Sequence, residues 1–381
     1  MARVSLLHTS PSPDMGTIRE CLQNGLELLG GIHAFVRRGA RVVLKPNVGS
    51  VAAPQEARNT DPRLIEALIQ LLQEFGVGEI VIAESAIVGF DTQVAFRAMG
   101  LDRLAHRYRV QLCDLKQQPF VTRKVRHPFV LPEIEVSGFL DEVDTLINLP
   151  KLKTISAVPV SFGLKNLKGL ISDGEKRRFH NRGLPKALGD LGQVVTPQLT
   201  IVDGIVASEL YEPREANLIV IGSDVLAVDA VAAAAIGLVP AEVEYFRLAH
   251  EAGMGPIDLD EIEVVGAALA ETRVFLRTAP TESEAFSMLF PEVAILDGEA
   301  CSGCIGSLYM GLKTARARGL LDSAPALKLV VGPGVKELPP GKQVLCLGNC
   351  TKPLAAAHFL PGCPFISIEF CALLHKAFLD Q

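Results

Sequence analysis

Arg41-Val-Val-Leu-Lys-Pro-Asn47 is an apolar run that ends in a turn, and Glu79-Ile-Val-Ile-Ala-Glu84 is a second run of the same kind. Both runs predict buried strands. Between them, Asn59-Thr-Asp-Pro62 can cap and open a helix, whose apolar residues recur at helical spacing as far as Gly76. A strand, a helix and a strand in this order form a βαβ unit, which predicts a parallel sheet with helices on its faces.

The same alternation continues along the chain. Apolar runs predict further strands over 110–114, 144–149, 199–203, 218–222 and 262–265, and helical patterns cover 225–236 and 241–251. The sequence therefore predicts an α/β fold, with parallel or mixed sheets and flanking helices in a two-part body.

The length of 381 residues exceeds that of one ordinary domain. Composition changes near residue 270, where a polar, mixed segment begins. We predict a body over 1–270, a linker or edge element over 271–290, and a smaller α/β module rich in cysteine over 291–381. In this module we expect a helix over 305–318 and strands over 327–331 and 343–347.

Charge and composition limit the kinds of partner. The net charge of −6 gives no basic field that would attract nucleic acid or anionic lipid. Trp is absent and only four Tyr occur, which argues against a surface that stacks bases. We find neither a signal peptide nor a run of about 18 apolar residues that would span a membrane. We therefore expect a cytoplasmic protein, in which clustered cysteines favour metal binding over disulfides.

Six of the eight cysteines lie in the last 81 residues, and four of them form a candidate ligand set. Cys301 and Cys304 are separated by two residues, Cys350 follows a predicted strand and a glycine, and Cys363 lies in a Gly-Cys-Pro turn. Thiolates are the ligands that iron–sulfur clusters and zinc select. The ends of parallel strands are where such sheets place their sites. We predict that these four thiols hold one 4Fe–4S cluster.

Two alternatives stay open for these thiols. Zinc is the second candidate, although structural zinc sites usually have two short pairs of ligands and this set has one pair and two single residues. The four thiols can also be inert, because a free cysteine packs as a small apolar residue. Cys346 lies in a predicted strand and is expected in the core, but it can replace one ligand. The other three cysteines are expected to be packing residues: Cys21, Cys113 and Cys371.

This module resembles the cluster-binding small subunits of nickel–iron hydrogenases and the related subunit of respiratory NADH dehydrogenase. The shared pattern is a Cys pair, a Gly-x-Cys and a Gly-Cys-Pro, with a tighter last spacing here. The resemblance implies four ligands for one 4Fe–4S cluster and says little about the reaction.

The middle of the chain is locally basic. Between Lys151 and Arg182 there are eight Lys or Arg residues against two acids, in a chain that is acidic overall. Such a patch attracts an anion. We predict that an anionic small molecule or cofactor is held by five lysines and oriented by two asparagines: Lys45, Lys151, Lys153, Lys165, Lys168, Asn47 and Asn166. The alternative is a solvated basic face whose lysine stems cover apolar surface.

Four other residues are weaker candidates. Asp203 and Asp224 follow apolar strands, where an acid can bind a metal, act as a base or cap a turn. Asp229 lies inside an apolar helix, where it needs a partner such as Lys165. His180 can act as an acid–base group or lie in a solvated basic loop.

Several motifs in this region resemble the domain-of-unknown-function 362 family. They are Lys45-Pro-Asn47, Thr60-Asp-Pro62, Pro150-Lys-Leu-Lys153, Gly163-Leu-Lys-Asn-Leu-Lys-Gly169, Val202-Asp-Gly204 and Asp224-Val-Leu-Ala-Val-Asp-Ala230. The likeness covers about residues 40 to 266. It implies the fold and an iron–sulfur association, commonly with an added ferredoxin-like domain, but no agreed reaction. This chain departs from that pattern, because it has no Cys-x2-Cys-x2-Cys run.

The leading hypothesis is a cytoplasmic 4Fe–4S protein that is redox-active and acts on, or activates, the anion held by the lysines. One rival is a non-redox isomerase or lyase in which the cluster is structural. The other is a non-enzymatic carrier or electron-transfer scaffold that docks on a redox protein. An oligomer is compatible with all three. The sequence identifies neither the substrate nor the electron donor.

Overall fold

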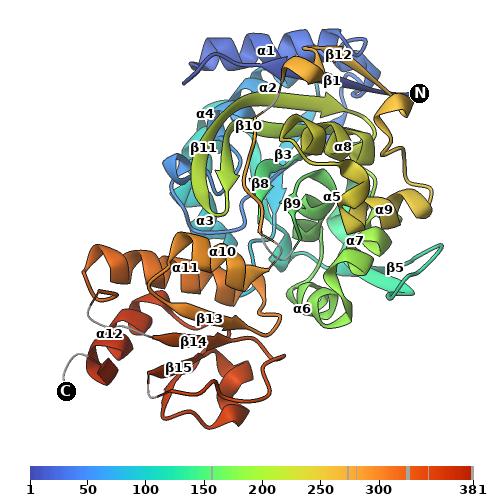
Figure 1. Cartoon of the computed structure of the whole chain (residues 1–381). Coiled ribbons are helices and arrows are strands. Elements are labelled where there is room, and N and C mark those ends of the chain that lie inside the picture. Colours follow the sequence, from blue (N-terminus) through green and yellow to red (C-terminus); the bar gives the residue numbers. More distant parts are fainter. Residues whose placement is uncertain (156–157, 273, 280, 323–326, 342, 379–381) are drawn as a thin grey trace. The chain divides into compact units, whose positions relative to one another are not determined.

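The computed structural model describes residues 1–155, 158–272, 274–279, 281–322, 327–341 and 343–378. The chain divides into two compact units. The first comprises 1–86, 90–154 and 158–277, and the second holds the described residues from Thr278 onwards together with 87–89 and Ile155. Helices and sheets alternate in both units, which confirms the predicted α/β class (Figure 1).

A ten-stranded mixed sheet forms the centre of the first unit. Its strands are β1 (Ala2–His8), β2 (Arg41–Pro46), β3 (Glu79–Glu84), β4 (Gln111–Asp114), β7 (Thr145–Leu149), β8 (Lys151–Thr154), β9 (Val160–Ser161), β10 (Leu199–Glu209), β11 (Glu212–Gly222) and β12 (Ile262–Gly266). The order is β12-β1-β11-β10-β7-β2-β3-β4, and β8 pairs with β10 and β9. The run β10-β7-β2-β3-β4 is parallel, as the βαβ pattern predicts.

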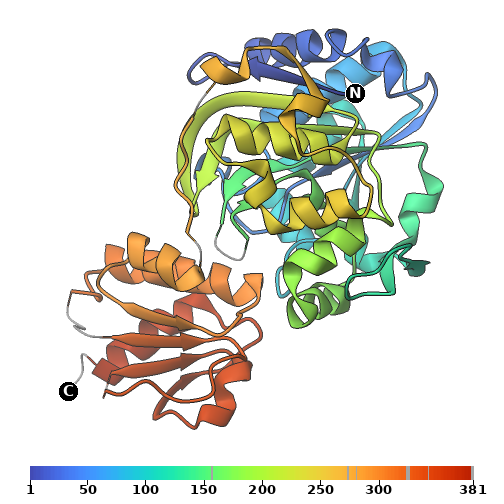
Figure 2. The same cartoon turned by 45° about the vertical axis from the view of Figure 1, so that its right-hand side comes forward.

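Helices lie on both faces of this sheet (Figure 2). They are α1 (Met15–Glu27), α2 (Pro62–Phe75), α3 (Thr92–Ala98), α4 (Leu101–Tyr108), α5 (Gly163–Asn166), α6 (Asp173–Arg182), α7 (Leu184–Gly192), α8 (Val225–Ala235) and α9 (Glu244–Glu251). A short 3-10 helix, η5 (Leu167–Leu170), continues α5.

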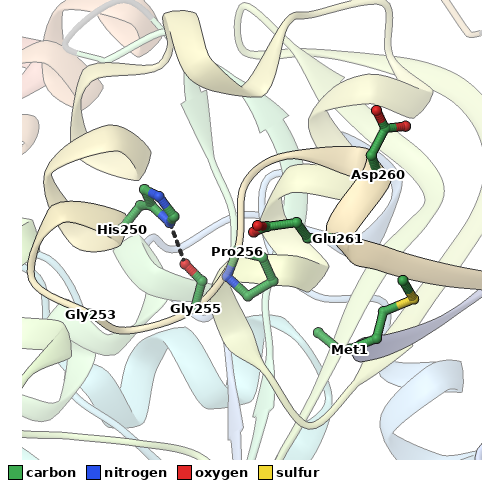
Figure 3. A pocket seen from close by; sticks show the side chains of 8 residues that line it. Met1, His250, Gly253, Gly255, Pro256, Asp260 and Glu261 are labelled. Carbon is green, nitrogen blue, oxygen red and sulfur yellow. Dashed lines mark hydrogen bonds between the residues drawn. The ribbon is translucent and has the colours of Figure 1, made fainter.

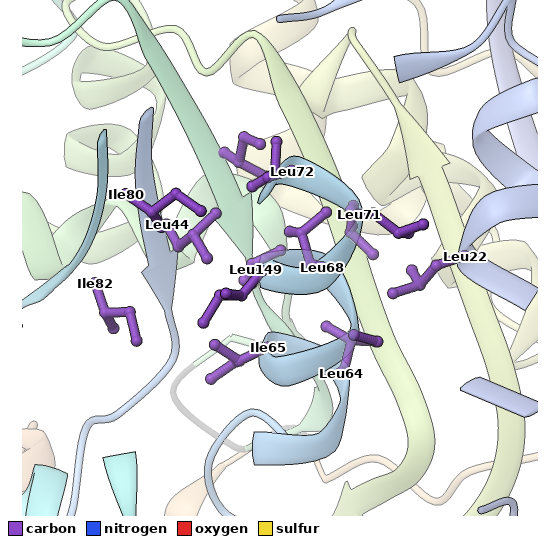
Figure 4. Packing of buried hydrophobic residues seen from close by; sticks show 14 of the residues in the cluster. Leu22, Leu44, Leu64, Ile65, Leu68, Leu71, Leu72, Ile80, Ile82 and Leu149 are labelled. Atoms are coloured by element: carbon purple, nitrogen blue, oxygen red, sulfur yellow. The ribbon is translucent and has the colours of Figure 1, made fainter. Parts of the chain in front are cut away.

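The helix predicted after Pro62 is α2, and its limits have local causes. Asp61 caps it by accepting a hydrogen bond from the Arg63 N–H, and Gly76 ends it with a φ of 91°. Its apolar face packs on alternate residues of β2 and β3, including Leu44 and Ile82 (Figure 4). Because side chains alternate along a strand, Lys45 lies on the opposite face of the sheet from Leu44.

Two strands are longer than the sequence predicts. β10 and β11 each have 11 residues and form an antiparallel hairpin, whereas the apolar runs covered only 199–203 and 218–222. The part of β11 that follows the turn, 212–217, is mostly polar. The apolar run that predicts a strand therefore begins only at Leu218. A separate antiparallel pair, β5 (Phe120–Lys124) and β6 (Glu133–Ser137), was not predicted.

The second unit has a four-stranded sheet that is entirely parallel. Its strands are β13 (Ala294–Asp297), β14 (Lys328–Val331), β15 (Val344–Leu347) and β16 (His358–Leu360), and its helices are α10 (Glu282–Leu289), α11 (Ser302–Ala317) and α12 (Ser367–Phe378). A 3-10 helix, η9 (Asn349–Leu354), follows β15.

Two boundaries differ from the predicted ones. The range 271–290, predicted as a linker or edge element, contains α10, whose cap is Thr281. Helix α11 begins at Ser302 and not at residue 305, so the Cys301–Cys304 pair lies at the start of this helix. The apolar spacing that predicts α11 begins only at Ile305, where the helix meets its core. The first residues of the helix are small and give no such pattern.

Among the described residues, no helix combines the length and the apolar character needed to cross a lipid bilayer.

Candidate functional site: a lysine cluster and a cysteine quartet

The predicted lysines gather at the carboxyl edge of the parallel strands in the first unit. Lys45 lies near the end of β2, and Lys151 and Lys153 lie on β8, directly after β7. Lys165 belongs to α5 and Lys168 to η5. We call these five residues the lysine cluster. Electrostatic interactions join Lys153 to both Lys151 and Lys165.

Lys45 is completely buried and forms an ion pair with Glu84, whose Oε2 is 2.5 Å from its Nζ. Nζ also donates to the Pro46 carbonyl at 2.9 Å. Burial lowers the pKa of Lys45, and the charge of Glu84 opposes that change. Glu84 was not predicted as a site residue. Its position at the end of the predicted strand 79–84 could have indicated it, because sites lie at the ends of parallel strands.

Lys151 is buried in the same way. Its Nζ donates to Oδ2 of Asp203 at 2.9 Å, and both side chains are almost completely buried. The same oxygen accepts the backbone N–H of Asp61 at 2.6 Å. Asp203, predicted to bind a metal, act as a base or cap a turn, therefore ties β10 to β8 and to the start of α2.

Lys153 has neutral hydrogen-bond partners. Its Nζ donates to Oδ1 of Asn47 and to the Arg58 carbonyl. Burial, followed by the positive charges of Arg58, Lys165 and Lys151, holds the pKa of Lys153 well below its ordinary value. The side chain is half-buried. An anion beside Lys153 would relieve the repulsion among these cations.

The two predicted asparagines lie in one hydrogen-bonded chain. Nδ2 of Asn47 donates to Oδ1 of Asn166 at 3.1 Å, and Nδ2 of Asn166 donates to Oδ1 of Asn148 at 2.8 Å. Oδ1 of Asn166 also accepts a hydrogen bond from Lys45 at 3.4 Å. The amides fix the positions of Lys45 and Lys153 relative to each other. Asn148 is a member of this chain that the sequence analysis missed.

Lys165 and Lys168 are half-buried on the helical turn that follows β9. Nζ of Lys168 lies 3.1 Å from Nε2 of His180 and 5.9 Å from the ring centroid of Phe179. His180 belongs to α6 and not to a solvated loop. Burial, followed by the charges of Lys168 and Lys165, holds the pKa of His180 well below its ordinary value.

A sixth lysine, Lys176, was counted only as part of the basic segment. Its Nζ donates to the carbonyls of Ser85 and Ala86 at 3.0 and 2.8 Å, and to the Ser85 hydroxyl at 2.7 Å. It also pairs with Asp173 at 3.2 Å. Burial lowers the pKa of Lys176 to about 8. Lys176 therefore holds the chain that follows β3 against α6.

The other two predicted acids are helix caps. Oδ1 of Asp224 accepts the N–H groups of Leu226 and Ala227, so it caps α8. Asp229 accepts the N–H groups of Gly163 and Leu164, at 2.7 and 2.9 Å. The expectation that Asp229 pairs with Lys165 was therefore wrong, because the N-terminus of α5 supplies its donors. Burial raises the pKa of Asp229 to about 8.

The four predicted cysteine ligands follow strand ends in the second unit. Cys301 comes after β13, Cys350 after β15 and Cys363 after β16. Cys304 lies in the first turn of α11, and Cys301 is the residue directly before that helix. Because the four strands are parallel, their carboxyl ends share one edge of the sheet. We call these four residues the cysteine quartet.

The thiols of the quartet lie close together. A Cβ built on Gly348 would be 3.3 Å from Sγ of Cys304 and 3.7 Å from Sγ of Cys350. Electrostatic interactions join Cys350 to Cys301 and Cys363. A hydrogen bond with Cys301, followed by burial, raises the pKa of the Cys304 thiol.

Backbone groups around the quartet point at sulfur. The Phe365 N–H hydrogen-bonds Cys304, and the Gly332 N–H hydrogen-bonds Cys350. Asn349 joins the two loops that carry single cysteines: its Oδ1 accepts the Gly362 N–H at 2.9 Å, and its own N–H donates to the Gly362 carbonyl at 2.9 Å. The segments of Cys350 and Cys363 are thus held together without a metal.

The other cysteines are buried. Cys346 lies on β15 within an apolar cluster, in agreement with the expected core position. Cys21, Cys113 and Cys371 are buried and unpaired with another cysteine. Within the described part of the chain, no three His, Cys, Asp or Glu side chains are already arranged as a metal site.

Two pockets in the first unit lie elsewhere. One has a volume of about 600 Å³ and is lined by Met1, Ala2, His250, Gly253, Gly255, Pro256, Asp260 and Glu261 (Figure 3). In it, His250 is bound through Nδ1 to the Gly255 carbonyl at 2.8 Å. The other, of about 380 Å³, is bordered by Arg126, Gln193 and Asp224 among others. Neither is lined by the lysine cluster or the cysteine quartet.

Comparison with solved structures gives two distant likenesses. One is a structural-genomics target from Thermotoga maritima, with 16% identity and a TM-score of 0.34, covering 51% of each chain. The other is the lactate racemase apoprotein from Thermoanaerobacterium thermosaccharolyticum, with 13% identity and a TM-score of 0.36, covering 59% of this chain and 55% of that one. This chain spans about half the length of each.

Comparison of sequences gives a nearer relative. The thylakoid-associated protein sll1697 of Synechocystis sp. (strain ATCC 27184 / PCC 6803 / Kazusa) is 30% identical over 264 residues, which are 66% of this chain and 80% of that protein. The family model described as domain of unknown function (DUF362) matches residues 42–234, a range that contains the whole lysine cluster. The chain therefore belongs to the DUF362 family.

Proposed function

We propose that the second unit binds one 4Fe–4S cluster through Cys301, Cys304, Cys350 and Cys363. The observation that carries this proposal is the approach of two of the thiols, Cys304 and Cys350, to the same glycine, Gly348. The electrostatic interactions of Cys350 with Cys301 and Cys363 support it further. The donor set fits the group: four thiols, with two backbone N–H groups directed at sulfur, match the ligation of iron–sulfur clusters.

Zinc is the second candidate for the quartet, because four thiolates also suit zinc. The spacing of one pair and two single cysteines favours the cluster. When bound, a 4Fe–4S cluster supplies one-electron transfer at a potential that burial and hydrogen bonds to sulfur adjust. The Gly332 and Phe365 N–H groups are this chain's own contribution to that adjustment.

The first unit, in this proposal, binds an anionic small molecule or cofactor at the lysine cluster. The contacts would come from Lys153, Lys165 and Lys168, which are half-buried. Lys45 and Lys151 are neutralised by Glu84 and Asp203, so they support the site. Asn47 and Asn166 orient Lys153 and Lys45. Repulsion between Lys153 and its cationic neighbours is the physical reason to expect an anion there.

Together these features suggest an iron–sulfur protein whose electrons serve the reaction or activation of that anion, with a redox protein as donor or acceptor. A reducing compartment such as the cytoplasm suits cysteines that form no disulfide within the described residues. The Synechocystis relative carries a thylakoid association in its name, and cell fractionation would test whether this chain shares it.

Anaerobic purification with iron, sulfide and zinc analysis tests the cluster. We expect about four iron and about four sulfide per chain, and absorbance near 400 nm that dithionite bleaches. Cys301→Ser should lose most of the iron, whereas Cys113→Ser, which changes a buried cysteine of the first unit, should keep it. A colourless protein with one zinc per chain would show that the quartet binds zinc and not a cluster. Iron unchanged in Cys301→Ser would remove that residue from the ligand set.

Titration calorimetry with sulfate tests the anion site. Lys153→Met should weaken sulfate binding about tenfold or more, because it removes a charge from the centre of the cluster. Lys186→Met, at an exposed lysine on α7, is the matched control and should leave the affinity unchanged. Equal affinities in all three proteins would reject the site. Conversion of the bound anion that continues after dithionite has bleached the cluster would favour the isomerase or lyase alternative. A protein that binds no small molecule at all would favour the non-enzymatic carrier.

A further inference from the structure

His180 and Lys168 make a contact that fixes the hydrogen-bonding state of the imidazole. Their Nε2 and Nζ atoms are 3.1 Å apart. An ammonium group has only hydrogens to donate, so Nε2 of His180 accepts and carries no proton. With Lys168 protonated, His180 is therefore a neutral imidazole whose proton is on Nδ1.

The surroundings keep His180 neutral. Burial disfavours the charged ring, and the positive charges of Lys168 on η5 and Lys165 on α5 act in the same direction. The nearest acids on α6 have cationic partners: Asp173 pairs with Lys116 and Lys176, and Glu175 pairs with Arg178. On the neighbouring helix α7, Asp190 accepts the N–H groups of residues 129–131, and Lys186 is exposed.

A bound anion would reverse this balance. A negative charge beside Lys165 and Lys168 cancels the field that opposes protonation, and it offers an acceptor to an Nε2–H group. Lys168 can then donate to the anion and no longer to the ring. Two lysines and one imidazolium would carry three positive charges, which suits a small oxyanion with two negative charges.

We propose that the lysine cluster takes up a small dianion together with one proton, and that Nε2 of His180 accepts this proton from solvent. The proposal rests on the anion site of the proposed function and adds to it the charge of the ligand and a proton-carrying residue. The bound state then has a protonated imidazole beside the anion, in a position to return its proton to that ligand. His180 is the acid of the site.

Histidine NMR on the full chain tests the proposal, with sulfate as the probe because its charge does not change near neutral pH. The protein is labelled with ¹³C at histidine Cε1, and His180→Gln assigns the signal. Saturating sulfate should raise the pKa of His180 by about one unit or more, which is tenfold or more in proton affinity. The exposed His33 serves as the internal control and should not respond.

Lys168→Met adds a second readout. Removing this charge should raise the pKa of His180 without sulfate and reduce the further change that sulfate causes. If sulfate binds by calorimetry and the pKa of His180 is unchanged in the wild-type protein, the inference is overturned and the anion site stands. If sulfate does not bind at all, the anion site itself fails, and the inference fails with it.

Discussion

Single lysines in this chain have three different settings, although the sequence presents them as one basic segment. Lys45 and Lys151 are buried against carboxylates, Lys153 is bound to neutral oxygens, and Lys168 contacts an imidazole. Removing one partner of a buried ion pair leaves an uncompensated buried charge. Glu84 and Asp203 are therefore needed to compensate the charges of Lys45 and Lys151. The setting of each lysine, and not its charge alone, determines whether it can contact a ligand.

Lys176 gives a prediction on pH. Burial lowers its pKa to about 8 from 10.5, so the folded state binds fewer protons than the unfolded state between these values. The cost of burying the charged form is complete below pH 8 and disappears as the pH rises to 10.5. The unfolding free energy of the wild type minus that of Lys176→Met should therefore rise with pH, by up to about 3 kcal/mol.

Urea unfolding at several pH values between 7 and 10.5 measures this difference. Lys186→Met, at an exposed position, supplies the comparison and should give a difference that does not vary with pH. A falling or flat difference for Lys176→Met would show that its hydrogen bonds to Ser85 and Ala86 outweigh the cost of burial.

At the scale of elements, α5 and η5 carry residues that contact the buried pair of Lys45 on β2 and Glu84 on β3. Asp229 of α8 caps the start of α5, and Asn166 at its end bonds to both Lys45 and Asn148. At Gly169 of η5, an added Cβ would be 1.8 Å from Oε1 of Glu84 and 2.6 Å from Nζ of Lys45. No side chain fits there unless the buried ion pair moves.

Gly169→Ala should consequently destabilise the protein by about 2–4 kcal/mol, since it overpacks the site and disturbs the pair of Lys45 and Glu84. The matched variant is Gly174→Ala on α6, where a Cβ would meet only Oγ of Ser172, at 3.6 Å. That exposed helical position should gain about 0.5 kcal/mol. Chemical denaturation of the two variants measures both changes, and equal stabilities would contradict the contact at Gly169.

The β10–β11 hairpin shows why some elements escaped prediction. Its turn residues, Leu210 and Tyr211, have positive φ values of 47° and 75°, which tight hairpin turns require. Asn-Gly or Gly-Gly usually marks such a turn in a sequence, and neither is present. Pairing along 11-residue strands imposes the conformation that the local residues do not announce.

On the scale of the whole molecule, the chain has two units with separate sheets and separate apolar cores. The lysine cluster belongs to the first, and the cysteine quartet to the second. Each candidate site lies where parallel strands end, which is the general rule for open α/β sheets. The quartet draws its residues from the ends of β13, β15 and β16, so occupation of this site should stabilise the second unit.

Hydrogen exchange provides the measurement. Removing iron from anaerobically purified protein should speed amide exchange in 298–304 and 348–366, because the metal bonds that add to the Asn349–Gly362 hydrogen bonds are then lost. Amides of β2 and β3 should be unaffected and serve as the internal reference. Unchanged exchange in 348–366 would contradict ligation by Cys350 and Cys363, and iron-free Cys301→Ser should behave like the stripped protein.

The sequence by itself determined the α/β class, the strands β2, β3 and β7, and the helices α2 and α8 within one or two residues. Local causes suffice there: an apolar period, a cap such as Asp61 and a stop such as Gly76 are all readable in order along the chain. It also predicted that Cys346 is buried in the core, because strand periodicity extends to that residue.

Only the tertiary structure determined which charges meet. Glu84 and Lys45 are 39 residues apart, Asp203 and Lys151 are 52 apart, and Lys153 and Arg58 are 95 apart. No local pattern encodes such pairings, because they follow from strand order and register in the sheet. The same is true of Asn349 and Gly362, which align two cysteine loops, and of His180, whose neutral state depends on lysines that α5 and η5 bring to it.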